Sequence, residues 1–315
     1  MNTPSPDRPA KLPLDFAFEG FRIIRQSPSV IPFWGLVALV GYIANKAIMQ
    51  AMAGTAMQDL EASSRTHDMT AMVAALTKLL PAFGVLVPLG IVINAFLCCA
   101  VFRAVAGKAV SFGGLRLGLD EVRQFGVAIL LFLMMFILYL AAILVGSIVG
   151  GILTVALGAI LPGLGAAGMA LSIAAVIGVF FWFGARLSLA PAQSFAEGRI
   201  VMLESWKLTR GNSLALVVGY VIALVMAALV GFLCFGIFLA GLAIVKSGNI
   251  QAVGGGMDAV QDADIGAIFR DPAVLAYVLL WNLAVAPLLM AITFGAPAAA
   301  YRRLSGRPSG AEGVF

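Results

Sequence analysis

The chain has 315 residues, of which 62% are hydrophobic and 11% are charged, and its mean hydropathy is +1.03. A soluble domain carries about 25% charged residues, so this composition excludes an ordinary soluble protein and favours a protein embedded in a lipid bilayer. The formal net charge of +5 comes from Lys and Arg at the ends of apolar runs rather than from one basic patch, so no nucleic-acid partner is expected.

The chain begins with a polar stretch, for which we expect a disordered tail over 1–13. An amphipathic helix is predicted over 14–26, because Leu14, Phe18 and Phe21 share one face and charged residues occupy the other. Such a helix lies in the membrane interface with its apolar face among acyl chains. The polar start is too long for a signal peptide, so the first apolar run is interpreted as a retained helix.

Six apolar runs follow, each long enough to cross a hydrocarbon core of about 30 Å. Each run is predicted to be helical, because backbone groups find no water partner in lipid. The predicted spans are 30–52, 79–102, 125–150, 165–187, 213–240 and 273–300. The expected fold class is therefore all-α: a polytopic transmembrane bundle forming a single integral membrane domain over 14–304, with a disordered tail at 305–315.

The distribution of Lys and Arg predicts the orientation of the spans. If the amino terminus is cytoplasmic, 15 of the 20 basic residues fall in cytoplasmic segments. The exceptions are Lys46, Arg65, Lys78, Lys246 and Arg270. Since cytoplasmic loops carry an excess of Lys and Arg, both termini are predicted to be cytoplasmic.

The cytoplasmic segments also predict an internal repeat. Phe18, Phe112 and Phe195 are each followed by an Arg four residues later, and Arg103 and Arg186 are separated by the same number of residues as Phe112 and Phe195. Chance similarity between apolar segments is the alternative, but agreement at polar positions favours repetition. We therefore expect three hairpins, each preceded by a cytoplasmic interfacial amphipathic helix. The predicted units are 14–105, 108–188 and 191–304.

The stretch WKLTRGN at 206–212 follows a span end bearing an Arg and a short amphipathic helix. In this setting it resembles a family of bacterial inner-membrane proteins that includes the membrane domain of glycerophosphoryl diester phosphodiesterases. Some members of that family join the membrane part to a soluble phosphodiesterase barrel, for which the 315 residues contain no segment. The resemblance therefore implies a membrane module in the bacterial inner membrane, without the catalytic domain.

Arginines at span ends and in interfacial segments are candidate binding sites for lipid headgroups. These residues are Arg103, Arg186, Arg302, Arg22, Arg116 and Arg199. Their side chains can meet anionic headgroups of the cytoplasmic leaflet. The alternative is that they only orient the spans, with their cationic ends reaching to the membrane surface.

Asn45, Asn94 and Asn282 are the main polar residues inside the predicted spans. Hydrogen bonding between helices, worth about 0.6 kcal/mol on average, is one interpretation. A path for a substrate is the other. No Asp or Glu lies inside any predicted span, which argues against proton-coupled transport.

The sequence does not predict catalysis, a metal site or a cofactor. His67 is the only histidine and lacks the spacing of metal ligands, and serines such as Ser147 and Ser172 have no base within the spans. The favoured function is that of a non-catalytic multi-pass inner-membrane protein that interacts with or organises lipids. The alternative is a transporter or channel for a neutral or weakly polar solute. The expected partners are membrane lipids, with a homo-oligomer or other membrane proteins left open.

Overall fold

The computed structural model describes residues 12–107, 111–161, 163–245 and 265–306. Every regular element in these ranges is helical, and six helices are long and apolar enough to cross a membrane. The predicted all-α class and the number of spans are confirmed. Most of the two predicted tails lies outside the described residues.

The first hairpin opens with the predicted short amphipathic segment. Its elements are the 3₁₀ helix η1 (Leu14–Phe18) and the α-helices α1 (Glu19–Gln26), α2 (Val30–Ala53), α3 (Ala56–Thr66) and α4 (Met69–Val105). Helix α4 begins well before the predicted span 79–102, because Asp68 caps it by accepting hydrogen bonds from two backbone N–H groups of the first turn. Ala56 of α3 packs with Leu79 and Ala82 of α4, so these early turns form a small core of their own.

The second hairpin is the longest extension of the molecule. Its elements are the 3₁₀ helix η2 (Ser111–Gly114), α5 (Leu119–Ile160) and α6 (Gly165–Leu187). The Ser172 hydroxyl donates a hydrogen bond to the carbonyl of Gly146 at 2.6 Å, and a Cβ at Gly150 or Gly168 would crowd the facing helix. Small residues therefore bring α5 and α6 together, as they do in membrane helix pairs.

The third hairpin contains the most irregular span. Its elements are α7 (Ala190–Glu197), α8 (Glu204–Leu208), α9 (Ser213–Val245), α11 (Ile265–Arg270), α12 (Pro272–Leu280), the π-helix η3 (Trp281–Val285) and α13 (Ala286–Leu304). The predicted span 273–300 is thus divided by a π turn, which precedes Pro287, a residue with no N–H to give to the helix. Asp271 caps α12 by accepting a hydrogen bond from the N–H of Ala273 at 2.8 Å.

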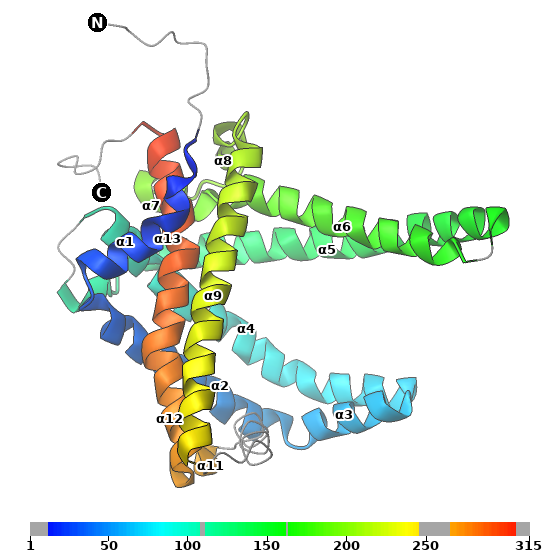
Figure 1. Ribbon diagram of the computed structural model, residues 1–315, viewed down its shortest axis with the longest axis horizontal. Helices are drawn as coiled ribbons and strands as arrows, with labels where there is room; N and C mark the ends of the chain where they lie inside the picture. The colour runs from blue at the N-terminus through cyan, green and yellow to red at the C-terminus, as the bar shows by residue number, and fades with distance from the viewer. Residues whose placement is uncertain (1–11, 108–110, 162, 246–264, 307–315) are drawn as a thin grey trace, which may run out of the picture.

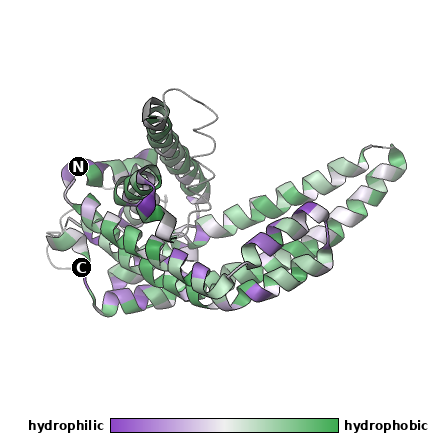
Figure 2. Ribbon diagram, turned by 90° about the horizontal axis from the view of Figure 1, so that it is seen from below, coloured by the Kyte–Doolittle hydropathy of each residue, from purple (hydrophilic) through white to green (hydrophobic). Residues whose placement is uncertain are grey.

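The three hairpins diverge from one shared end, as Figure 1 shows. We call this end the hub; it consists of η1, α1, η2, α7 and α8 with the segments that join them to the spans (residues 14–26, 111–118 and 188–212) and the last two turns of α4, α6 and α13, at residues 99–105, 181–187 and 298–304. The largest core cluster of buried side chains is centred here and extends onto α2 and α9. By contrast, only 6% and 11% of the residues are buried in the most apolar stretches of the spans formed by α5 and α6. Figure 2 shows mainly apolar residues along the projecting helices, and many large apolar side chains of α5 and α6 are exposed, among them Ile137, Ile152 and Leu171. Such arms require lipid as their solvent.

Helix α1 crosses α13 at a pair of glycines. Gly20 faces the backbone of Ile292, and a Cβ there would overlap the Ile292 Cα. A Cβ at Gly295 would lie 3.0 Å from the backbone nitrogen of Gly20. The amphipathic helix of the first hairpin therefore rests directly on the last span.

Replacing Gly20 by Ala should destabilise the hub, because neither backbone can yield to the added methyl group. Overpacking of this kind costs about 1–3 kcal/mol. We expect Gly20→Ala to unfold at a lower SDS fraction than the wild type, followed by tryptophan fluorescence in detergent. Gly84→Ala in α4 is the matched control, since a Cβ there meets open space and Ala favours the helix. Equal unfolding of both variants would contradict the close crossing.

Candidate functional site

Arg103, at the end of α4, is buried and fully engaged inside the hub. Its Nη1 donates a hydrogen bond to the carbonyl of Gly114 in η2 at 2.7 Å and lies 2.6 Å from Oε1 of Glu121. Its Nη2 lies 3.4 Å from Oδ2 of Asp120, and the guanidinium stands 5.7 Å from the ring centroid of Phe195. A single cation therefore ties α4 to the start of α5 and to α7.

Arg186, at the end of α6, is held between two indole rings. Its guanidinium carbon lies 5.4 Å from the ring centroid of Trp182 and 5.2 Å from that of Trp206, and Nη1 donates to the carbonyl of Trp206 at 3.3 Å. The hydroxyl of Ser205 donates back to the carbonyl of Arg186 at 3.2 Å. These contacts fix α8 against the end of α6.

Arg302, at the end of α13, connects the last span with the first hairpin. Its Nη1 donates to the carbonyl of Val105 at 2.7 Å, and its Nη2 lies 3.3 Å from Oε1 of Glu19. The neighbouring Arg303 pairs with Asp15 of η1, and the hydrogen bond from that guanidinium lowers the pKa of the Asp15 carboxyl. Two adjacent cations thus fasten the amphipathic segment to α13.

The backbone conformation of the turn η2 points two of its carbonyl groups toward side chains of α2 and α4. Phe112, Gly113 and Gly114 all have positive φ angles, which glycine adopts without strain and phenylalanine rarely does. The carbonyl of Gly113 accepts a hydrogen bond from the indole N–H of Trp34 at 2.7 Å, and that of Gly114 accepts from Arg103. The second unit is therefore led by a left-handed turn rather than by a complete amphipathic helix.

Removing the charge of Arg103 should destabilise the protein, because Glu121 would remain buried without its cation. Breaking a buried pair in this way costs roughly 3–5 kcal/mol. We expect Arg103→Gln to lower the free energy of unfolding in SDS titrations and Glu121→Gln, added to it, to recover part of the loss. Arg116→Gln is the control, since its side chain is exposed. An unchanged transition for Arg103→Gln would contradict the internal role.

The other three predicted arginines lie at the hub surface. Arg22 pairs with Glu19 at 2.8 Å but is still half-exposed. Arg116 is exposed, and Arg199 is exposed while contacting Glu197 and Glu204. Headgroup binding by any of the six arginines stays a prediction, and these three have the more accessible guanidinium groups.

The three predicted asparagines lie in different surroundings. Asn45 in α2 is exposed, and Asn282 in η3 is buried and donates to the carbonyl of Val278 one turn earlier at 2.9 Å. Asn94 in α4 is exposed and lines a cavity between the hairpins. The structure therefore does not bring the three together into one polar path.

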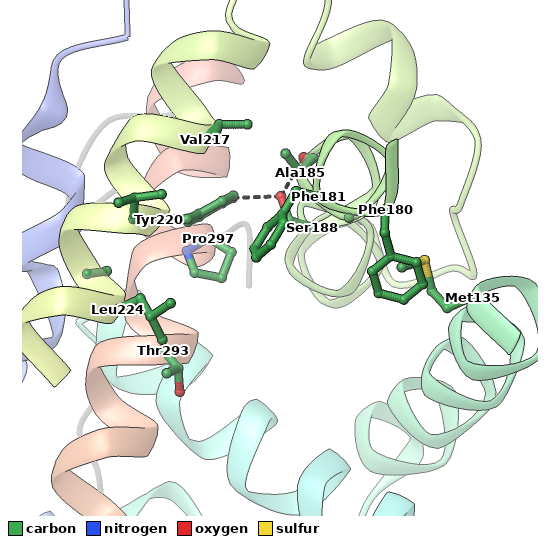
Figure 3. Close-up of a pocket in the computed structure, with 13 residues that line it drawn as sticks. Met135, Phe180, Phe181, Ala185, Ser188, Val217, Tyr220, Leu224, Thr293 and Pro297 are labelled. Atoms are coloured by element: carbon green, nitrogen blue, oxygen red, sulfur yellow. Dashed lines mark hydrogen bonds between the residues drawn. The ribbon is translucent and has the colours of Figure 1, made fainter. Parts of the chain in front are cut away.

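Two apolar cavities lie where the three hairpins separate. The first, the α4 chamber, has a volume of about 620 Å³ and lies between α4, α5 and α13. The second, the α9 chamber, has a volume of about 440 Å³ and lies between α5, α6, α9 and α13 (Figure 3). Both are lined in part by the same four residues, which are Met135, Ser188, Thr293 and Pro297. Figure 3 shows Phe181, Tyr220 and Leu224 around the α9 chamber, where the hydroxyls of Ser188 and Tyr220 lie 2.7 Å apart.

Gln124 is a site residue that sequence reasoning did not identify. It is 3% exposed, lines the α4 chamber, and its Nε2 lies 3.7 Å from the sulfur of Cys98. Its Oε1 has no hydrogen-bond partner within the described part of the chain. The signal in the sequence was an uncharged amide directly before the apolar run 125–150, a place where charged residues are the common choice.

Neither a cluster of metal ligands in the described residues nor a similar protein of known function helps to define the site. Among the described residues, no group of three or more His, Cys, Asp or Glu side chains could hold a metal ion. No protein-family model, curated protein or solved structure matches the chain. A proposal for the function therefore rests on the geometry of the hub and of the two chambers.

Proposed function

We propose that this multi-pass membrane protein is a non-catalytic protein that binds and organises lipids in a bacterial inner membrane, with its hub at the cytoplasmic surface. The observation that carries the proposal is the pair of apolar chambers between the diverging hairpins. Their polar groups are few and uncharged, so acyl chains suit them better than water or ions.

The hub surface supplies the second half of the argument. Arg22, Arg116 and Arg199 lie on segments that border the spans, and Arg25 and Arg210 are exposed on the same segments. Cations near a membrane surface attract anionic headgroups by about 1 kcal/mol each. The hub therefore offers charge to headgroups while the spaces beneath it offer apolar walls to their chains.

Neutralising the surface arginines should release anionic lipid. We expect the triple variant Arg22→Gln/Arg116→Gln/Arg199→Gln to retain several-fold less phosphatidylglycerol than the wild type after purification, measured by mass spectrometry. Retention of phosphatidylcholine should not change. Arg65→Gln is the control, because Arg65 is 78% exposed on α3, away from the hub. Equal loss from the control, or no loss from the triple variant, would contradict headgroup binding at the hub.

The orientation can be tested with impermeant thiol reagents. In a chain whose native cysteines are replaced by Ala, His67→Cys lies at the end of α3 and Leu117→Cys lies in the hub, where Leu117 is 88% exposed. We expect labelling of position 67 in intact cells and labelling of position 117 only after the membrane is opened, because basic segments stay cytoplasmic. The reverse pattern would place the hub outside.

Transport of a neutral or weakly polar solute is the second candidate. It is favoured by Asn94, whose amide lines the α4 chamber with no partner among the described residues. In proteoliposomes, swelling in glycerol or urea that disappears in Asn94→Leu would support transport. The same vesicles without solute flux, but with retained phospholipid, would support the lipid role.

A further inference from the structure

The α4 and α9 chambers together have the shape of a forked apolar site. They meet at the four shared residues named above and then run along different helices, one beside α4 and the other beside α9. Each volume lies within the range of ligand cavities in proteins, about 300–1,000 Å³. A forked apolar space fits a molecule with two hydrocarbon chains better than a compact solute.

Gln124, which lines the α4 chamber at its hub side, carries an unpaired acceptor. Oε1 of Gln124 is buried without a hydrogen-bond partner among the described residues, while the amide nitrogen of the same side chain faces Cys98. Asn94 lies one turn before Cys98 in α4 and lines the same chamber. A buried acceptor without a donor costs about 1–3 kcal/mol, so a ligand hydroxyl that reaches Gln124 would gain free energy.

Charge excludes a phosphate at this position. The residues lining the two chambers include no Asp, Glu, Lys or Arg. The cations nearest to Gln124, Arg103 at the end of α4 and Arg123 on α5, already pair with Glu121 and Asp120 respectively. A phosphate in the fork would lose its hydration and gain no counter-ion, which is costly in an apolar site.

We propose that the forked site binds one uncharged two-chain lipid of the diacylglycerol class, with its hydroxyl donating to Oε1 of Gln124 and one acyl chain in each chamber. Asn94 and Thr293 each stand nine residues before the span-end arginine of their own helix, or about 14 Å along it. These two side chains therefore lie beneath the hub at the level of acyl chains, whereas Gln124 lies closer to the hub, beside Cys98, which is five residues before Arg103 on α4. This inference rests on the proposed lipid role and names the lipid.

The test compares two lipids that differ only by a phosphate. Purified full-length protein in detergent is titrated with dioleoylglycerol and with dioleoyl phosphatidic acid, and bound lipid is quantified by native mass spectrometry. We expect dioleoylglycerol to bind at least tenfold more tightly. Equal affinities, or tighter binding of phosphatidic acid, would overturn the assignment.

Two variants locate the binding in the fork. Gln124→Leu removes the acceptor and should weaken dioleoylglycerol binding about five- to tenfold. Gly90→Leu extends a side chain into the α4 chamber, where a Cβ meets no neighbour within 4 Å, and should abolish binding while thermal unfolding shows that the protein still folds. Unchanged binding in Gly90→Leu would overturn the proposal.

Gln193→Leu is the matched control for the glutamine. Oε1 of Gln193 is likewise buried without a hydrogen-bond partner, but Gln193 lies in α7 and lines neither chamber. Dioleoylglycerol affinity should be unchanged in this variant, and an equal loss in both glutamine variants would overturn the role of Gln124. Retention of phosphatidylglycerol at the hub is a separate measurement, so the forked site can fail while the wider lipid function stands.

Discussion

Burial of the guanidinium of Arg103 is the constraint on which the arrangement of the hairpins depends. A cation at the edge of a hydrocarbon layer is stable only when its charge is paired and its donors are used. Arg103 has its charge paired with Glu121, and it donates a hydrogen bond to the carbonyl of Gly114. Because these partners lie on the next hairpin, satisfying one charge also fixes where η2 and α5 stand against α4.

The hub and the arms follow different physical rules. In the hub, polar bonds and close glycine contacts such as Gly20 on Ile292 define specific neighbours. Along the α5–α6 arm, pairing is largely confined to the two helices of the hairpin, and the outer faces remain apolar and exposed, whereas α2 also packs on η3 and α12 of the third hairpin. Lipid removes the penalty for that exposure, so the arms can diverge and leave chambers between them. The same separation that sets the hub apart from the arms therefore leaves the two apolar chambers between them.

The spans and their ends could be predicted from the sequence because they depend on local properties. Hydropathy defined six helices, and the predicted start of the last span at residue 273 lies one residue from Pro272, the first residue of α12. The second leading segment was not predictable in this way. The repeat favoured a helix there, but η2 is a left-handed turn whose carbonyl groups accept hydrogen bonds from Arg103 of the preceding span and from Trp34, a distant residue of α2.

The candidate site was only partly predictable for the same reason. The sequence placed Arg103, Arg186 and Arg302 at the ends of predicted spans, but the contacts of each depend on the fold. Gln124 was missed because it precedes the apolar run by one residue, and only the packing of α4 against α5 places it in a chamber. A boundary drawn by hydropathy cannot separate an amide that faces water from one that faces a cavity.

The partners of the three arginines follow one rule that bears on the predicted repeat. Arg103 binds η2, which leads the second unit, and Arg186 binds α8, which belongs to the leading segment of the third. Arg302 binds Glu19 of α1, which leads the first unit, and so closes the cycle. Unrelated hairpins would have no reason to repeat this order. The threefold repeat stays a prediction from the sequence, but it accounts for why each hairpin is joined to the next by an arginine at the same position.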